Sequence, residues 1–274
     1  MSIIAISRGT FSGGEAVAKG VADRLGYRCV SREVVLEAAW AYGIPAEELI
    51  DAMEKRPPLW QRLTGERSDH ITFVRAALCE NARGGKSVYH GYVGHLFLPG
   101  VSHVIGVRVI ADMEYRIRAA MQQRNLTRKE AVSYIETVDK ERRQWTRFLF
   151  DVDWDDPSLY DVVLNLGRMS IATACDTVVH LTERDEFKPT ADSMRAMQNL
   201  TLGSQAAAVL ARDPRTRGAV VQVAANDGVV TVTGTTQSPS VLDAIPGVAR
   251  QVAGVTDVRN EVRFLREGAA GAPD

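Results

Sequence analysis

Gly9 and Gly14 have the spacing of the two glycines in a phosphate-binding loop of the form G-x-x-x-x-G-K-[ST]. Glycines allow the backbone to turn tightly, so that its N–H groups point at phosphate oxygens. In such a loop the lysine neutralises the β- and γ-phosphates, and the hydroxyl residue binds magnesium. Here Glu15 and Ala16 occupy those two places. The stretch therefore predicts either a phosphate site with an altered charge or a tight strand-to-helix turn whose glycines serve packing only.

The elements on either side of this loop suit both interpretations. Residues 3–6 are an apolar run typical of a buried strand, and Val17, Val21 and Leu25 recur every four residues in the helix that follows. Further strands are expected at 87–91, 103–110 and 160–166, helices at 33–42, 46–54, 70–83, 112–124 and 127–150, and a proline-bearing loop at 54–69. Strands that alternate with helices predict an α/β fold with a doubly wound parallel sheet.

The pattern changes near residue 180. The next segment is polar and mixed, which predicts a linker with some helix in it, mobile at about 185–203, between two separable halves. Beyond it, apolar residues alternate on both sides of Asn226, Asp227 and Gly228, a strong hairpin signal. A helix and one more strand complete a small α-β-β-α-β domain. The predicted boundaries are 1–184 for the first domain, 185–203 for the linker, 204–266 for the second domain and 267–274 for a frayed tail.

The composition excludes several classes of protein. A formal net charge of −1 gives no positive footprint for nucleic acid or for an anionic membrane. No apolar run approaches the length of a membrane helix, and the N-terminus lacks the pattern of a secretory signal. The three cysteines are scattered and odd in number, which argues against a disulfide framework. His90 and His95 do not share a face, so no metal site is expected there. We expect a cytoplasmic protein.

The N-terminal stretch resembles the cytidylate-kinase-like branch of the P-loop nucleoside monophosphate kinases. That branch begins with a strand followed by S-R-x-x-x-S-G-G-R-E. This chain carries the matching residues Ser7, Arg8, Ser12, Gly13 and Gly14. Farther on, "EYRIRAAMQQRNLTRKEAVSYIETVDKERRQWTRFLFDVDWDDPSLYDVVLN" is similar to the lid and last strand of the family, and the resemblance covers about residues 1–180.

The chain departs from the family pattern at two places. Glu15 stands where the family has arginine, with Ala16 in place of the glutamate that follows it. Tyr92 takes the place of the arginine in a G-R-G motif. Arg8 or Lys19 could replace the missing cation.

The resemblance implies a P-loop kinase fold in which a helical lid closes over two nucleotides. It implies phosphoryl transfer from ATP, with Mg²⁺, to a CMP-like nucleoside monophosphate, a reaction that depends on positioning and charge neutralisation. Arg116, Arg142 and Arg143 fall on the lid pattern as catalytic candidates. Carried over residue by residue, the phosphate and nucleotide site would comprise Arg8, Gly9, Ser12, Gly13, Gly14 and Glu15.

The C-terminal segment resembles a BON domain. The matching stretches are "VLARDPRT", "VQVAANDGVVTVTGTTQSP" and "GVARQVAGVTDVRNEV". The resemblance implies an interaction module, through self-association or a protein partner, and not a catalytic one. Residues from 204 onward carry equal numbers of basic and acidic side chains, which gives membrane attraction no support.

Two functions therefore compete. The first is a nucleoside monophosphate kinase whose turnover is weakened by Glu15, since an anion beside phosphates repels them. The second is a catalytically degenerate nucleotide sensor that signals through the BON-like module.

Overall fold

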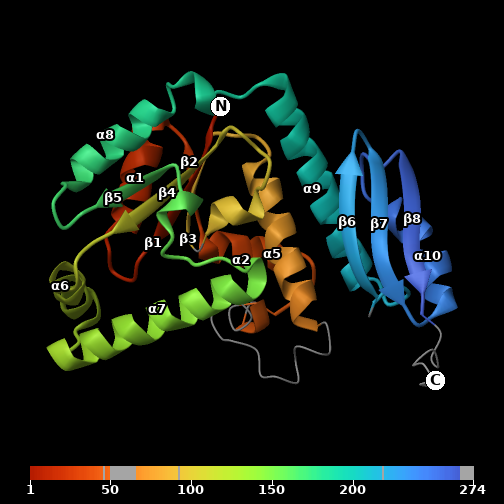
Figure 1. Cartoon of the computed structure of the whole chain (residues 1–274), viewed down its shortest axis with the longest axis horizontal. Coiled ribbons are helices and arrows are strands. Elements are labelled where there is room, and N and C mark those ends of the chain that lie inside the picture. Colours follow the sequence, from red (N-terminus) through yellow and green to blue (C-terminus); the bar gives the residue numbers. More distant parts are fainter. Residues whose placement is uncertain (46, 50–65, 92, 218, 266–274) are drawn as a thin grey trace, which may run out of the picture.

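A computed structural model describes residues 1–45, 47–49, 66–91, 93–217 and 219–265. It contains a five-stranded sheet and a three-stranded sheet, which lie on either side of one long helix, α9 (Figure 1). The predicted tail at 267–274, Tyr92 and most of the predicted loop at 54–69 lie outside the described residues.

The larger sheet is parallel throughout, as predicted. Its strand order is β2-β3-β1-β4-β5, and each hydrogen-bonded neighbour runs in the same direction. The strands are β1 (Ile3–Arg8), β2 (Arg28–Ser31), β3 (Ser87–Gly91), β4 (Val104–Ile110) and β5 (Val162–Asn165). The carboxyl ends of all five strands meet at one edge, which is where ligands bind in such sheets.

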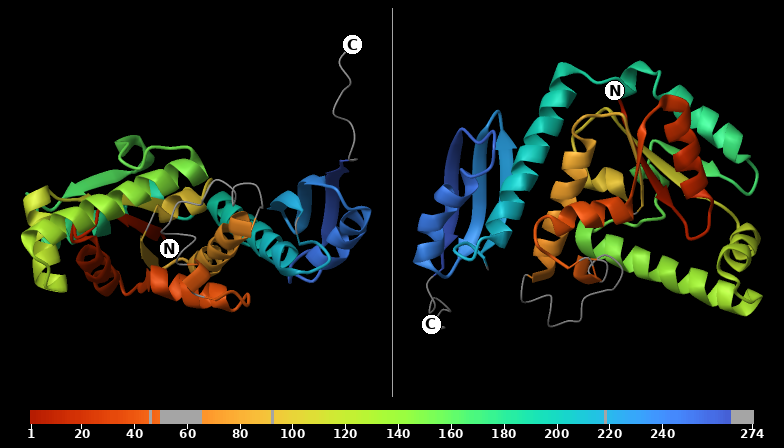
Figure 2. Two further views of the ribbon diagram at one scale, coloured as in Figure 1. Left: turned by 90° about the horizontal axis from the view of Figure 1, so that it is seen from below. Right: turned by 180° about the vertical axis from the view of Figure 1, so that it is seen from behind.

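Helices cover both faces of this sheet. One core joins Ile4 and Ile6 of β1 to α1 and α8, and these two helices lie side by side (Figure 2). The other core joins Tyr89 of β3 to α2, α5 and α7. The helices are α1 (Gly14–Leu25), α2 (Arg32–Trp40), α5 (Glu66–Ala82), α6 (Met113–Arg124), α7 (Arg128–Phe150) and α8 (Ile171–Leu181), with short 3₁₀ turns η1 (Gly94–Phe97), η2 (Pro157–Leu159) and η3 (Asp185–Phe187). The predicted doubly wound fold is confirmed.

The smaller sheet follows the predicted α-β-β-α-β order. Strands β6 (Val220–Asn226) and β7 (Val229–Thr236) are antiparallel, and β8 (Asp257–Phe264) pairs in parallel with β7. The turn between β6 and β7 has positive φ at Asp227 and at Gly228, the backbone that a tight hairpin requires. Helix α10 (Pro239–Ala249) packs with α9 against one face of the sheet.

The structure differs from the sequence prediction between residues 185 and 203. Most of this segment belongs to α9 (Ala191–Arg212), which starts at a capping box between Thr190 and Ser193. Met197 packs with Ile3 and Cys79 of the first unit, while Leu210 packs in the core of the smaller sheet. Composition suggested a linker because polar residues are mixed with the apolar ones between 185 and 203. Neighbours on both sides bury the apolar residues, so the helix is continuous.

No helix in the described part of the chain has both the length and the apolar character needed to cross a membrane.

Candidate functional site

The glycine loop lies between β1 and α1, at the carboxyl edge of the sheet. Gly13 has a φ of +87°, and a Cβ there would lie 2.6 Å from Cδ1 of Leu166. A Cβ on Gly14 would lie 2.6 Å from the Cβ of Arg8. Packing therefore demands both glycines, whatever the loop binds. Gly9 has no such close contact, because the nearest heavy atom to a Cβ there is 3.5 Å away.

The first turn of α1 offers donors to an anion. Its N-cap, Gly13, has no side chain to accept the N–H groups of that turn. The Ser12 hydroxyl is directed elsewhere, since it donates to the Val109 carbonyl at 2.9 Å. Free N–H groups at a helix N-terminus, together with the helix dipole, are a suitable environment for phosphate.

A cleft of about 890 Å³ lies between this loop and the helices α6 and α7. Of the predicted phosphate-site residues, it is lined by Arg8, Gly13, Gly14 and Glu15. Gly9 and Ser12 lie in the same loop but not on the described wall of the cleft. The charged lining residues are five basic ones and three acidic ones, namely Arg8, Lys19, Arg32, Arg124, Arg142, Glu15, Glu33 and Glu141. The cleft is therefore suited to an anionic ligand.

Glu15 is engaged by Lys19, one helical turn along α1. Lys19 Nζ lies 2.7 Å from a carboxylate oxygen of Glu15, and both side chains are more than half exposed at the cleft. The hydrogen bond from Lys19, with smaller help from the charge of Arg8, lowers the pKa of Glu15. The Glu15 carboxylate at the lysine position is thus paired with the Lys19 ammonium.

Arg116 joins the glycine loop to α6 and α7, the two helices of the predicted lid. It forms an ion pair with Asp139 of α7, and its Nε donates to the Thr10 carbonyl at 2.7 Å. The Thr10 hydroxyl donates to Asp139 at 2.7 Å. We call this three-residue contact the lid clasp. Both charged side chains are largely buried, and Arg116 does not line the described wall of the cleft.

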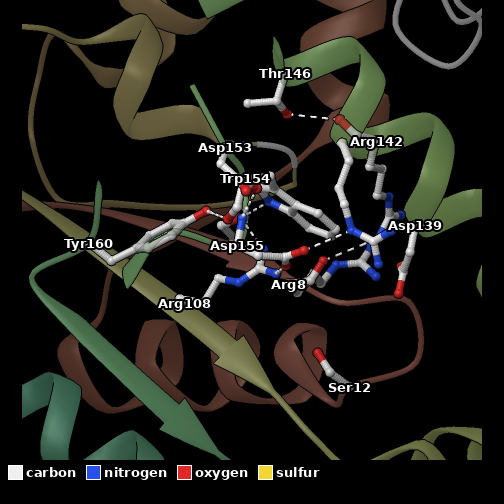
Figure 3. A network of polar contacts seen from close by, with 12 residues as sticks. Arg8, Ser12, Arg108, Asp139, Arg142, Thr146, Asp153, Trp154, Asp155 and Tyr160 are labelled. Atoms are coloured by element: carbon white, nitrogen blue, oxygen red, sulfur yellow. Dashed lines mark hydrogen bonds and ion pairs between the residues drawn. The ribbon is translucent and has the colours of Figure 1, made fainter. Parts of the chain in front are cut away.

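Arg142 and Arg143 are adjacent in sequence but point to different places. Arg142 lines the cleft and donates to the Arg8 carbonyl at 3.1 Å (Figure 3). Arg143 donates to Asp155 at 2.7 Å, away from the described wall of the cleft. Of the three predicted catalytic arginines, the structure thus brings Arg142 to the cleft and places Arg116 and Arg143 in ion pairs.

Sequence reasoning missed a buried arginine under this site. Arg108 lies in the middle of β4, is 5% exposed, and shares Asp155 with Arg143 at 2.7 Å. Its guanidinium carbon lies 3.8 Å from the ring centre of Trp154, and Trp154 Nε1 donates to the Ser7 hydroxyl (Figure 3). The sequence does contain a signal for this residue, namely an arginine within the apolar run "VIGVRVI". A charge that is buried in a strand requires partners, which marks it as a residue of interest.

The histidines do not form a metal site in the described structure. Burial and the nearby Arg8 charge lower the pKa of His90, and burial together with Arg108 lowers that of His95 to about 4. Among the described residues, no group of three or more His, Cys, Asp or Glu side chains is arranged to hold a metal ion.

The loop also lacks the usual magnesium ligand. The Ala16 side chain has no oxygen where the motif has a hydroxyl, and the Ser12 hydroxyl already donates to the Val109 carbonyl. The residues present therefore do not fit the metal-binding arrangement of that motif.

Comparisons with known proteins agree with the fold. Residues 3–168 match the cytidylate kinase-like family, and residues 200–266 match the BON domain. A cytidylate kinase from Ignicoccus hospitalis is 26% identical over 181 residues, which are 65% of this chain and 97% of that protein. An uncharacterized protein from Eubacterium ventriosum has a solved structure with a TM-score of 0.51 and 22% identity, over 67% of this chain and 99% of that one. This chain therefore belongs to the cytidylate kinase-like family and carries a BON domain at its C-terminal end.

Proposed function

We propose that this protein transfers a phosphoryl group from ATP to a nucleoside monophosphate of the CMP type. One observation carries the proposal: the cleft between the glycine loop and the lid is lined by Arg8, Lys19 and Arg142 together with the first turn of α1. Membership of the family supports it, and so does the name of the curated relative, a cytidylate kinase.

The residues of the cleft would act by positioning and by charge. The N–H groups of the first turn of α1 would bind phosphate oxygens, and Arg142 would neutralise charge that develops on the transferring group. Arg142 is held for this task by its hydrogen bond to the Arg8 carbonyl, so little reorientation is needed. Arg116 would be a positioning residue, since it holds the lid against the loop.

Magnesium would enter with ATP. Because Ala16 supplies no ligand, the triphosphate and water would provide most of its oxygens. The ion would supply charge neutralisation, and no step above depends on it.

A second candidate function is nucleotide sensing with little turnover. Glu15 at the lysine position favours it, because each properly aimed donor in an active site contributes roughly 10²–10³ in rate. In that case nucleotides would bind without phosphoryl transfer, and the BON domain would report the bound state.

A coupled ADP-release assay with ATP and a panel of monophosphates tests both. We expect turnover with a pyrimidine monophosphate, and Arg142→Gln should lower it at least about 100-fold. Arg147→Gln is the matched control, an exposed arginine on the same helix that does not line the cleft. A parallel thermal-shift screen with the same nucleotides separates the outcomes. Binding without turnover supports the sensor, and the absence of both binding and turnover overturns both functions.

A further inference from the structure

A second cavity lies at the junction of the kinase-like unit and the BON domain. It has a volume of about 370 Å³, and none of its lining residues belongs to the main cleft. Its lining residues come from the segment after α2, from α5, from the C-terminal end of α9 and from the turn that follows α9. Its walls include Tyr42, Gly43, Glu48, Phe73, Arg212 and Arg217.

Two arginines give this junction cavity a positive character. Arg212 is the basic residue in the last turn of α9, and Arg217 follows after a short turn. Within the described structure neither guanidinium forms an ion pair with an acidic side chain. The neighbouring Asp213 is paired instead with Arg215, at 2.7 Å. Glu48 is the acidic residue of the described lining, and it lies 3.8 Å from His70.

An aromatic pair forms another part of the wall. The rings of Tyr42 and Phe73 have centres 5.5 Å apart at an angle of 35°. Phe73 is buried and therefore fixed by packing, while Tyr42 is partly exposed. Arg212 reaches this wall, since its Nη2 lies 3.6 Å from where a Cβ on Gly43 would be. A fixed flat surface beside two guanidinium groups suits a flat ring that carries an anion.

We propose that the junction cavity binds a mononucleotide, with the phosphate at Arg212 and Arg217 and the base against Tyr42. Its volume lies near the lower end of the range of small-molecule sites, roughly 300–1,000 Å³, which favours a mononucleotide over a larger ligand. The site is additional to the proposed kinase cleft and does not depend on that function.

Such a site would be connected to the main cleft by a single helix. Arg32 and Glu33 at the start of α2 line the main cleft, and Tyr42 follows closely after its end. A ligand held between Tyr42 and Arg212 would therefore join α2 to the BON domain.

Titration calorimetry with AMP and CMP on the full chain tests the proposal. The variant Arg212→Gln/Arg217→Gln removes both guanidinium groups, and since both side chains are exposed its melting temperature should stay close to that of wild type. Arg259→Gln/Arg263→Gln is the matched control, with the same loss of charge on exposed positions of β8. Inorganic phosphate and the free nucleosides serve as further probes of the two halves of the ligand.

For AMP or CMP we expect a binding event that belongs to the junction cavity. Its affinity should be at least about tenfold weaker in the Arg212→Gln/Arg217→Gln variant and unchanged in the control. Phosphate and nucleoside alone should each bind more weakly than the mononucleotide. If every binding event is the same in all three proteins, the nucleotide occupies only the main cleft and the junction site is overturned. If no binding occurs in any of them, the junction site fails together with the proposed kinase.

Discussion

Glu15 and Lys19 change what a glycine loop without its lysine can do. An isolated carboxylate in the cleft would repel a triphosphate, yet here a lysine ammonium lies 2.7 Å from it. Because side chains in a helix lean toward its N-terminus, Lys19 reaches back toward the loop from one turn away. The pair therefore places the Lys19 ammonium near the usual position of the motif lysine. Glu15, which stands at that lysine's place in the sequence, holds it there.

The first prediction concerns this pair. Lys19→Ala should weaken ATP binding by at least about tenfold, or ~1.4 kcal/mol, because Glu15 would then face the phosphates unpaired. Glu15→Arg should tighten it by a similar factor, since it restores the cation of the family. The measurement is titration calorimetry at fixed salt, with Lys129→Ala on α7 as the control. Equal affinity in every variant would mean that the pair does not face the phosphates.

The second prediction concerns pH and His95. Its pKa falls from an ordinary 6.5 to about 4, since burial and Arg108 oppose its charged form. The unfolded chain therefore takes up this proton at a higher pH than the folded chain does. The free energy of unfolding therefore keeps its full value above about pH 6.5. It decreases by on the order of 3 kcal/mol as the pH falls toward 4.

Denaturant titrations of wild type and His95→Phe across this range measure the effect. The phenylalanine keeps a ring against Tyr160, whose centre is 4.8 Å from that of His95, but cannot be protonated. The variant should lose less stability on acidification. Parallel curves for the two proteins would exclude His95 as the source.

At the scale of elements, the lid is fastened to the loop it would cover. The lid clasp joins α6 and α7 to Thr10, and Phe11 packs into the small core between those helices. Phe11 has a φ of +58°, which is unfavourable for a bulky side chain and must be offset by that packing.

The third prediction tests the lid clasp. Asp139→Ala should lower the free energy of unfolding by about 3 kcal/mol, because it leaves the buried Arg116 unpaired. Amide hydrogen exchange in α6 and the first half of α7 should become faster. Glu136→Ala, an exposed position on the same helix, should change neither quantity. Unaltered exchange in Asp139→Ala would show that Phe11 and its neighbours hold the lid by themselves.

Local patterns predicted the elements better than the site. The strand-helix alternation, the hairpin at Asp227 and the capping box at Thr127 follow from periodicity and backbone preferences, and the structure contains them all. The partners of Arg116 and Arg143 depend on which elements meet in space. Asp155 accepts from both Arg108 and Arg143, 47 and 12 positions away in sequence, so spacing alone could not assign them.

At the scale of the whole molecule, α9 belongs to two cores. Because its N-terminal half packs against α5 and its C-terminal half against the smaller sheet, neither core is complete without it. The fourth prediction is a single calorimetric unfolding transition for the full chain, with equal calorimetric and van't Hoff enthalpies. Two separated transitions would instead favour the independent halves that composition suggested.

The continuity of α9 also has a mechanical consequence. A helix of 22 residues is a rod about 33 Å long at 1.5 Å per residue. Because the helix is unbroken from Ala191 to Arg212, a tilt of about 5° imposed on it as a rigid rod displaces one end relative to the other by about 3 Å, by the same geometry. Movement of α5 would thus displace the BON domain by a distance of this order.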